Sequence, residues 1–237
     1  KTDYENIDWE STPDRVNYGA MYQKRYPLLH KAADKFLECP PKEFEEFCME
    51  NAFWLNDFAL FMALKDAHHG APWSEWPMVL RNRENDALKA ATQIYRNSIN
   101  FWKVLQYLFF EQWKALKAYA HANDISIIGD LPIYVSLDSV DVWAHPELFQ
   151  LDENRLPKEV AGCPPDGFSA EGQLWGNPLF DWDYMEQTNY AWWIRRIEYL
   201  CKVYDVLRID HFRAFEGYYA IPYGDATAKN GSWKQGP

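Results

Sequence analysis

The spacing of apolar residues in the first half of the chain is helical. From Lys42 onward, apolar side chains recur every three or four positions as far as Met62, and Gly70 and Pro72 end the pattern. Residues 83–122 have a similar pattern, with an expected apolar face of Val104, Leu105, Leu108, Phe109, Leu116 and Tyr119. The spacing therefore predicts a mainly helical first half, with one or two long helices over 83–122.

The second half has the pattern of strands that alternate with helices. Two short apolar runs, Asp124–Asp130 and Asp205–Asp210, read as strands, and a helical pattern over Tyr190–Tyr204 leads into the second. A helix followed by such a strand is typical of a parallel sheet. Between the runs, Pro132–Trp182 is rich in Pro, Gly and Trp and is expected to be a long loop, and long loops are usually functional.

Acidic residues close both expected strands. Because side chains alternate along a strand, Arg208 and Asp210 share one face, and Asp130 ends the other strand. In parallel barrels the catalytic residues lie at this carboxyl end. A guanidinium within about 4–6 Å keeps a carboxylate ionised, and an ionised aspartate in a dry cleft can attack an anomeric carbon. A structural ion pair inside a core is the alternative, and it stays open.

The expected loop combines amide side chains with large rings. Asp166–Phe168 and Gln173–Pro178 suit a polysaccharide groove better than a phosphate site, which would use glycine-rich turns and basic residues. A structural loop that caps a barrel remains an equal alternative. His211 follows the second strand, and by itself it is more typical of a packing histidine than of a catalytic base.

Composition narrows the classes of partner. The 237 residues carry a net charge of −11, which argues against binding nucleic acid or an anionic membrane surface. Aromatic side chains make up 17 % of the chain, a surplus over the needs of a core that suits contact with flat, apolar faces. No apolar run reaches the roughly 18 residues of a membrane span, and the acidic N-terminus is not a secretory signal. The cysteines have no metal-like spacing and predict reduced thiols in a cytoplasmic protein without a metal: Cys39, Cys48, Cys163 and Cys201.

Ordered motifs of the second half resemble one enzyme family. The sequences GDLPIYV, DSVDVWAHPELF, VAGCPPDGFS, GQLWGNPLFDW, RIDHFRAF and GDATAKNGSWKQGP are similar to the amylomaltase, or disproportionating-enzyme, family of 4-α-glucanotransferases. The resemblance is dense from Asp124 to Pro237. It is weaker but visible through the helical half, in Arg15–Leu29 and Trp54–Lys65.

The resemblance implies an α/β fold: the middle strands of a (β/α)8 TIM barrel over 123–237, and a helical insertion over 1–122. It implies retaining transfer of α-1,4-glucan segments from a donor maltodextrin to the 4-hydroxyl of an acceptor sugar, without a cofactor. Asp210 would be the nucleophile and Arg208 would orient it. Maltodextrins and small sugars would contact the remaining candidate residues: Asp130, Tyr134, Phe168, Gln173, Trp175, Asn177 and His211.

The chain departs from the family pattern in places. Gly167 stands where an aromatic residue is usual, and Ala214 and Asp124 stand where glycine is usual or frequent. The resemblance places the general acid/base glutamate beyond Pro237, and nearby Glu171 and Glu216 do not match its position.

The length of the chain indicates whether it could contain a complete barrel. Beside a helical half there is room for only three or four βα units of about 30 residues, whereas a closed barrel needs about 250 residues. We therefore expect an internal fragment with little transferase activity, whose strand edges favour self-association. A non-catalytic glucan-binding module and an amylase-type hydrolase are the alternatives.

Overall fold

A computed structural model describes residues 2–12 and 14–237, and contacts divide these into two compact units. The helical unit comprises the chain up to His69 together with Asn85–Leu116, and the sheet unit comprises Gly70–Glu84 and Lys117–Pro237. The domain boundary expected between residues 122 and 123 stays a prediction. The structure adds that Gly70–Glu84, which lies within the expected helical half, packs with the sheet unit.

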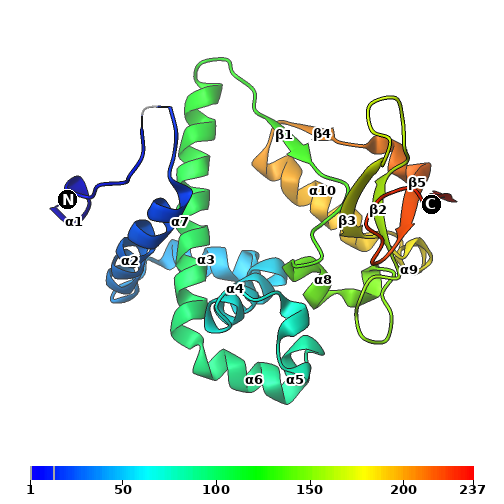
Figure 1. Ribbon diagram of the computed structural model, residues 1–237. Coiled ribbons are helices and arrows are strands. Elements are labelled where there is room, and N and C mark those ends of the chain that lie inside the picture. Colours follow the sequence, from blue (N-terminus) through cyan, green and yellow to red (C-terminus); the bar gives the residue numbers. More distant parts are fainter. Residues whose placement is uncertain (1, 13) are drawn as a thin grey trace. The chain divides into compact units, whose positions relative to one another are not determined.

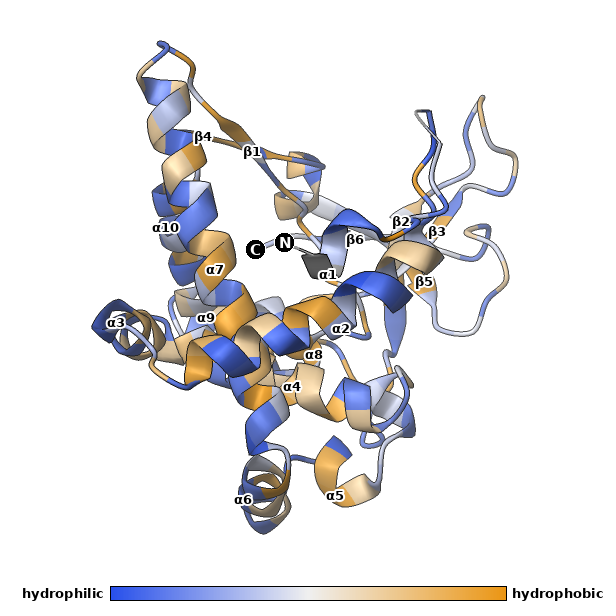
Figure 2. Cartoon of the chain, turned by 90° about the vertical axis from the view of Figure 1, so that its left-hand side faces the viewer, coloured by the Kyte–Doolittle hydropathy of each residue, from blue (hydrophilic) through white to orange (hydrophobic). Residues whose placement is uncertain are grey.

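The helical unit contains α1 (Thr2–Glu5), α2 (Tyr18–Leu37), α3 (Lys42–Glu50), α4 (Ala52–Ala67), α6 (Asn85–Ile94) and most of α7 (Arg96–His121). Hydrophobic and polar residues alternate along α2 and α7, as Figure 2 shows. The expected helix from Lys42 is interrupted at Asn51, which is buried. Its side-chain amide donates to the Phe47 carbonyl and its Oδ1 accepts from the Trp54 indole, so the break costs no unpaired polar atom there.

The apolar face expected on α7 is partly wrong. Val104 is fully buried, but Phe109, Leu116 and Tyr119 are each more than half exposed. The buried rings are instead Phe101, Trp102 and Tyr107. Tyr107 meets Phe36, Phe44 and Phe47 of α2 and α3 at centroid distances of 5.5–5.7 Å, so the partner helices decide which face is covered.

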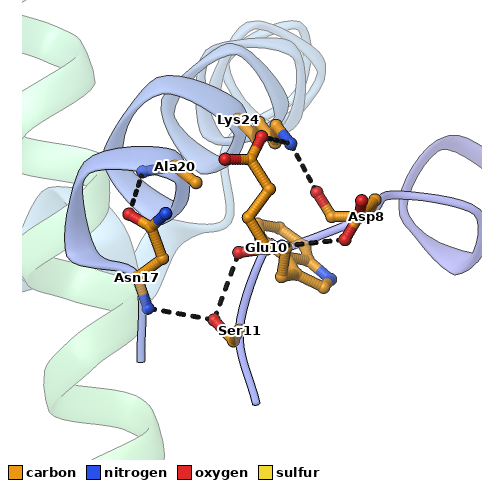
Figure 3. Close-up of polar contacts among 7 residues, drawn as sticks. Asp8, Glu10, Ser11, Asn17, Ala20 and Lys24 are labelled. Carbon is orange, nitrogen blue, oxygen red and sulfur yellow. Dashed lines mark hydrogen bonds and ion pairs between the residues drawn. The ribbon is translucent and has the colours of Figure 1, made fainter. Parts of the chain in front are cut away.

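Polar contacts attach the segment before α2 to that helix (Figure 3). Lys24 Nζ donates to the Asp8 carbonyl and to Glu10 Oε1, both at 2.5 Å. The Asn17 backbone N–H donates to Ser11 Oγ, and Asn17 Oδ1 accepts the Ala20 N–H at 3.0 Å. Asn17 therefore caps α2 in the way that asparagine favours.

The two strands expected from the apolar runs are present in the sheet unit. β1 (Ile128–Leu131) and β4 (Val206–Ile209) pair in parallel with Asp130 opposite Arg208, and α10 (Ala191–Val203) leads into β4. β1 begins later than expected, at Ile128, and Asp124 belongs to the turn after α7, with a left-handed φ of 57°. Burial alternates along β1, where Ile128 and Asp130 are exposed.

The expected long loop is wrong, because 132–182 contains regular structure. It holds α8 (Val140–Ala144), η2 (Pro146–Leu148), β2 (Glu159–Cys163), β3 (Gln173–Pro178) and the start of α9 (Trp182–Gln187). β2 and β3 join β5 (Gly217–Pro222) and β6 (Ser232–Gln235) in an antiparallel sheet of order β3-β2-β5-β6 (Figure 1). β3 could not be predicted from the sequence, because its residues QLWGNP are mostly exposed and do not alternate between buried and exposed positions.

Short helices complete the sheet unit: η1 (Trp73–Glu75), α5 (Met78–Arg81) and η3 (Phe212–Phe215). A cluster of Val160, Tyr219, Ile221 and Ala228 forms a core on the antiparallel sheet. The fold is thus mixed α/β. Among the described residues, no helix is long and apolar enough to span a membrane.

Gly129 tests the packing of the parallel pair. A Cβ at this position would lie 2.1 Å from Cδ2 of the Tyr204 ring, which is too close for a methyl group. Because overpacking of a filled site is costly, we expect Gly129→Ala to lower the free energy of unfolding by about 1–3 kcal/mol in urea titrations followed by tryptophan fluorescence.

The matched control is Gly167→Ala. Nothing lies within 4 Å of a Cβ at Gly167, so this substitution should change stability by less than about 0.5 kcal/mol. Equal stabilities of the two variants would contradict the packing described for Gly129.

Candidate functional site

A guanidinium lies between two carboxylates at the carboxyl ends of β1 and β4. Arg208 Nη2 donates to Asp210 Oδ1 at 2.7 Å, and Arg208 Nη1 lies 3.5 Å from Asp130 Oδ2. All three side chains are more than half exposed, so this is not an ion pair inside a core. Exposed ion pairs of this kind contribute only about 0–1 kcal/mol to the free energy of unfolding. A role in stability alone therefore does not explain why the three charges lie together.

Asp210 borders a cavity of about 200 Å³. The structure brings several of the residues singled out in the sequence to this one cavity, which is lined by Pro132, Ile133, Tyr134, Trp175, Asn177, Asp210 and His211. Arg208 adjoins it through its ion pair with Asp210, and Asp130 is linked to it through Arg208. Because polar groups converge there with rings, the cavity has the character of a small-molecule site.

Rings form one side of the cavity. The Trp175 ring meets His211 edge-on with centroids 5.0 Å apart, and it lies 6.3 Å from the Tyr134 ring. Burial raises the pKa of the Tyr134 phenol well above its ordinary value, and the nearby Tyr218 and Cys163 act in the same direction. The phenol is therefore neutral at physiological pH and keeps its O–H as a donor.

His211 turns away from β4 in a left-handed conformation with φ 53°. Burial lowers the pKa of its imidazole; Asp210 acts against the shift, and Arg213 adds to it. The ring beside Asp210 is consequently neutral near pH 7, with one nitrogen that donates and one that accepts.

A bulge in β3 presents Trp175 and Asn177. Leu174 pairs with Gly162 and Pro178 with Val160, so three residues of β3 face one of β2. Gly176, at the centre, has φ +78°, which favours glycine. Bulges re-aim side chains near functional sites. Asn177 Nδ2 donates to the Val135 carbonyl at 2.8 Å, which fixes the bulge to the segment after β1.

Two further predicted residues lie beside or apart from this cavity. Gln173 reaches it indirectly, because its Oε1 accepts the Trp175 indole N–H at 2.9 Å. Phe168 does not line the cavity and is fully exposed, on a turn in which Asp166 Oδ1 accepts the N–H groups of Phe168 and Ser169. Glu171, one expected candidate for a second carboxylate, pairs with Lys229 and does not line the cavity either.

Sequence reasoning missed the group that fixes the start of both strands. Asp205 Oδ2 accepts the Ile127 N–H and a bond from His121 Nε2, each at 2.9 Å, and Asp205 Oδ1 lies 3.0 Å from Lys117 Nζ. The Ile127 N–H, followed by His121, holds the pKa of the Asp205 carboxyl well below its usual range. The sequence shows only an acidic residue directly before β4. Its partners are more than 75 residues away in sequence, so the contacts could not be read from the local pattern.

Within the part of the chain that the structure describes, His, Cys, Asp and Glu residues do not form a group of three that could hold a metal ion. The Asp210 cavity itself offers a carboxylate, an imidazole and aromatic rings, with the Arg208 guanidinium beside it.

The neighbours of His211 predict how its pKa responds to substitution. By NMR titration we expect its midpoint below the ordinary 6.5, lower still in Asp210→Asn and higher in Arg213→Gln. Because the pKa of His211 is lower in the folded protein than in the unfolded chain, its neutral ring does not reduce the free energy of unfolding above pH 6.5. The free energy of unfolding then decreases as the pH falls from 6.5 through the lowered pKa. If the titration midpoint of His211 were the same in the wild type and in both variants, this geometry would be contradicted.

Comparisons with known proteins give consistent matches. A sequence profile of the family described as 4-alpha-glucanotransferase matches residues 2–237. The 4-alpha-glucanotransferase of Clostridium butyricum is 44 % identical over all of this chain and 49 % of its own length. That of Thermus thermophilus is 49 % identical over 94 % of this chain and 45 % of its own.

Solved structures agree. An amylomaltase from Streptococcus agalactiae in complex with acarbose matches with a TM-score of 0.96 and 44 % identity, over 100 % of this chain and 48 % of that one. An amylomaltase from Corynebacterium glutamicum, 19 % identical over 96 % of this chain and 30 % of that one, has a TM-score of 0.72 and shows likeness of fold alone. The chain spans about half the length of the curated relatives it matches.

Proposed function

This chain belongs to the 4-alpha-glucanotransferase family, and we propose that the whole protein transfers α-1,4-glucan segments from a donor maltodextrin to the 4-hydroxyl of an acceptor sugar. The observation that carries the proposal is the exposed Asp210 carboxylate, held by Arg208 at 2.7 Å on the edge of a cavity with aromatic walls. The structural relative crystallised with acarbose supports a saccharide as the ligand class.

Asp210 is the proposed nucleophile. Its free oxygen attacks the anomeric carbon of the donor and the glycosidic bond breaks, so that a glycosyl ester on Asp210 forms and the rest of the donor leaves as an alcohol. The leaving oxygen takes its proton from the general acid that the resemblance places beyond Pro237. The hydroxyl of a second sugar then gives its proton back to that group, attacks the same carbon and releases the Asp210 carboxylate. Arg208 orients the Asp210 carboxylate, since one of its oxygens accepts the guanidinium bond and the other is left to face the sugar.

The surrounding groups bind and orient the sugar. Trp175 and Tyr134 offer ring faces to sugar C–H groups, while Asn177, His211 and Asp130 offer polar atoms to hydroxyls. Gln173 supports the Trp175 indole, and the exposed Phe168 covers a sugar further along the chain.

We also propose that β1 and β4 are neighbouring strands of a (β/α)8 barrel, with the helical unit as its insertion. The parallel pairing, α10 before β4 and the carboxylates at the carboxyl strand ends support this reading. Retaining transfer needs a second carboxylate about 5–5.5 Å from the first. The resemblance places it beyond Pro237, so the 237 residues alone should transfer little, and their open strand edges favour self-association.

Removal of the nucleophile tests the proposal. In the whole protein, Asp210→Asn should lower disproportionation of maltotriose into glucose and longer maltodextrins by at least about 10⁴-fold, the loss seen when a member of a catalytic unit is removed. The exposed Asp183→Asn on α9, which lines no site described above, is the matched control and should keep wild-type activity.

The assay also separates the alternatives. Binding of maltodextrin without any transfer, unaffected by Asp210→Asn but lost in Trp175→Ala, would identify a glucan-binding module. Release of glucose without longer products would identify a hydrolase. Full transfer activity in Asp210→Asn would remove Asp210 from the mechanism.

A further inference from the structure

Three arginines of the sheet unit come together at the end of α5. Arg81 is the last residue of that helix, Arg83 follows two positions later, and Arg155 comes from the turn before β2. Arg155 donates through Nη1 to the Arg81 carbonyl at 3.1 Å and through Nη2 to the Asn82 carbonyl at 3.2 Å. Its guanidinium is therefore fixed against the backbone that carries the other two arginines.

The three guanidiniums are electrostatic neighbours. Burial lowers the pKa of Arg155, and the positive charges of Arg83 and Arg81 lower it further, whereas Glu147 acts in the opposite direction. The Glu147 carboxylate is shared, because its Oε1 lies 3.3 Å from His145 Nδ1. Arg155 thus has two positive neighbours and one negative neighbour, and a bound anion would relieve the repulsion between them.

The contacts of the other two arginines orient them. Arg81 Nη1 donates to the Ser74 carbonyl at 3.1 Å, and the guanidinium carbon of Arg83 lies 4.2 Å from the centroid of the Trp143 ring. A carbonyl dipole or a ring face holds a guanidinium without cancelling its charge. Arg81 Nε is buried and finds no hydrogen-bond acceptor among the residues that the structure describes. Acceptor atoms are therefore in short supply at this cluster.

Two of the arginines stand where the backbone favours glycine. Arg155 has φ 61° and Arg83 has φ 58°, both left-handed. The turn that carries Arg155 has a fixed shape, because Asp152 Oδ1 accepts the N–H groups of Asn154 and Leu156 at 2.8 and 2.9 Å. Backbone strain of this kind is concentrated at ligand sites. Since glycine would satisfy the backbone at both positions, what the two arginines add is their guanidinium groups.

The chemistry of the cluster selects an anion with several oxygen atoms. A guanidinium is planar, remains charged and presents its donors in pairs that match the oxygen atoms of phosphate. Three guanidiniums suit a phosphate dianion better than a carboxylate, whose two oxygen atoms a single guanidinium can occupy. The net charge of the chain is −11, so this positive cluster is a local feature and not part of a generally basic surface.

We propose that Arg81, Arg83 and Arg155 together bind a phosphate group at the end of α5. The phosphate oxygens accept from the guanidinium N–H groups and bring negative charge to the place where three positive charges meet. The described residues that line the Asp210 cavity do not include these arginines, and the ligand is charged whereas the proposed glucan substrate is neutral. The proposal therefore does not rest on the proposed function.

Isothermal titration of the whole protein with inorganic phosphate, at an ionic strength held constant with sodium chloride, tests the proposal. We expect a dissociation constant of about 1 mM or lower, weakened at least about tenfold in Arg155→Gln and in Arg155→Gly. The glycine variant removes the guanidinium and relieves the backbone at φ 61°, so circular dichroism should show it folded. Arg96→Gln, at an exposed arginine of α7 in the helical unit, is the matched control and should bind as the wild type does.

A second titration, with glycerol 3-phosphate, distinguishes the sources of the phosphate group. Tighter binding of this ester than of inorganic phosphate, lost in both Arg155 variants, supports the site with a phosphate monoester as its ligand. Equal or weaker binding of the ester supports the site with free phosphate as its ligand. Failure of the wild type to bind either compound, or equal affinity in the wild type and the folded Arg155→Gly variant, overturns the site.

Discussion

The site depends on one guanidinium that lies between two carboxylates. Asp130 and Asp210 end neighbouring parallel strands, and without a cation between them their charges would repel across the mouth of the cavity. Arg208 contacts both, and it can do so because the register of the pair sets it opposite Asp130 and two residues before Asp210. The electrostatics of the site therefore follow from backbone pairing. Asp205 secures that pairing at the opposite end of the strands.

A second constraint comes from the antiparallel sheet. Three residues of β3 face one residue of β2, so the ladder is interrupted there, and Trp175 and Asn177 from this bulge line the Asp210 cavity. The positive φ of Gly176 allows the backbone to turn, and the Asn177 amide bond to Val135 ties the bulge to the segment after β1. A ring from one sheet thus becomes a wall for a carboxylate on the other.

The sequence predicted the parts of this architecture whose signals are local. The apolar runs ending in Asp130 and Asp210 located both parallel strands, and alternation placed Arg208 and Asp210 on one face. It failed for β3, because a mostly exposed, bulged strand has no period of two, and for β2, whose three central residues are all buried and so do not alternate either. It also missed Asp205, whose bonds to Lys117 and His121 join positions far apart in sequence. The roles assigned to individual site residues stay predictions.

The turn that carries Phe168 has a consequence for binding. The Asp166 carboxylate accepts two backbone N–H groups at 2.8 Å, so the loop conformation is fixed while the ring stays wholly in water. The loop has already lost its conformational entropy on folding. The Phe168 ring, in contrast, is still hydrated. Whatever covers the ring therefore gains the release of ordered water, at about 25 cal/mol for each Å² of apolar surface, without an ordering penalty from the backbone.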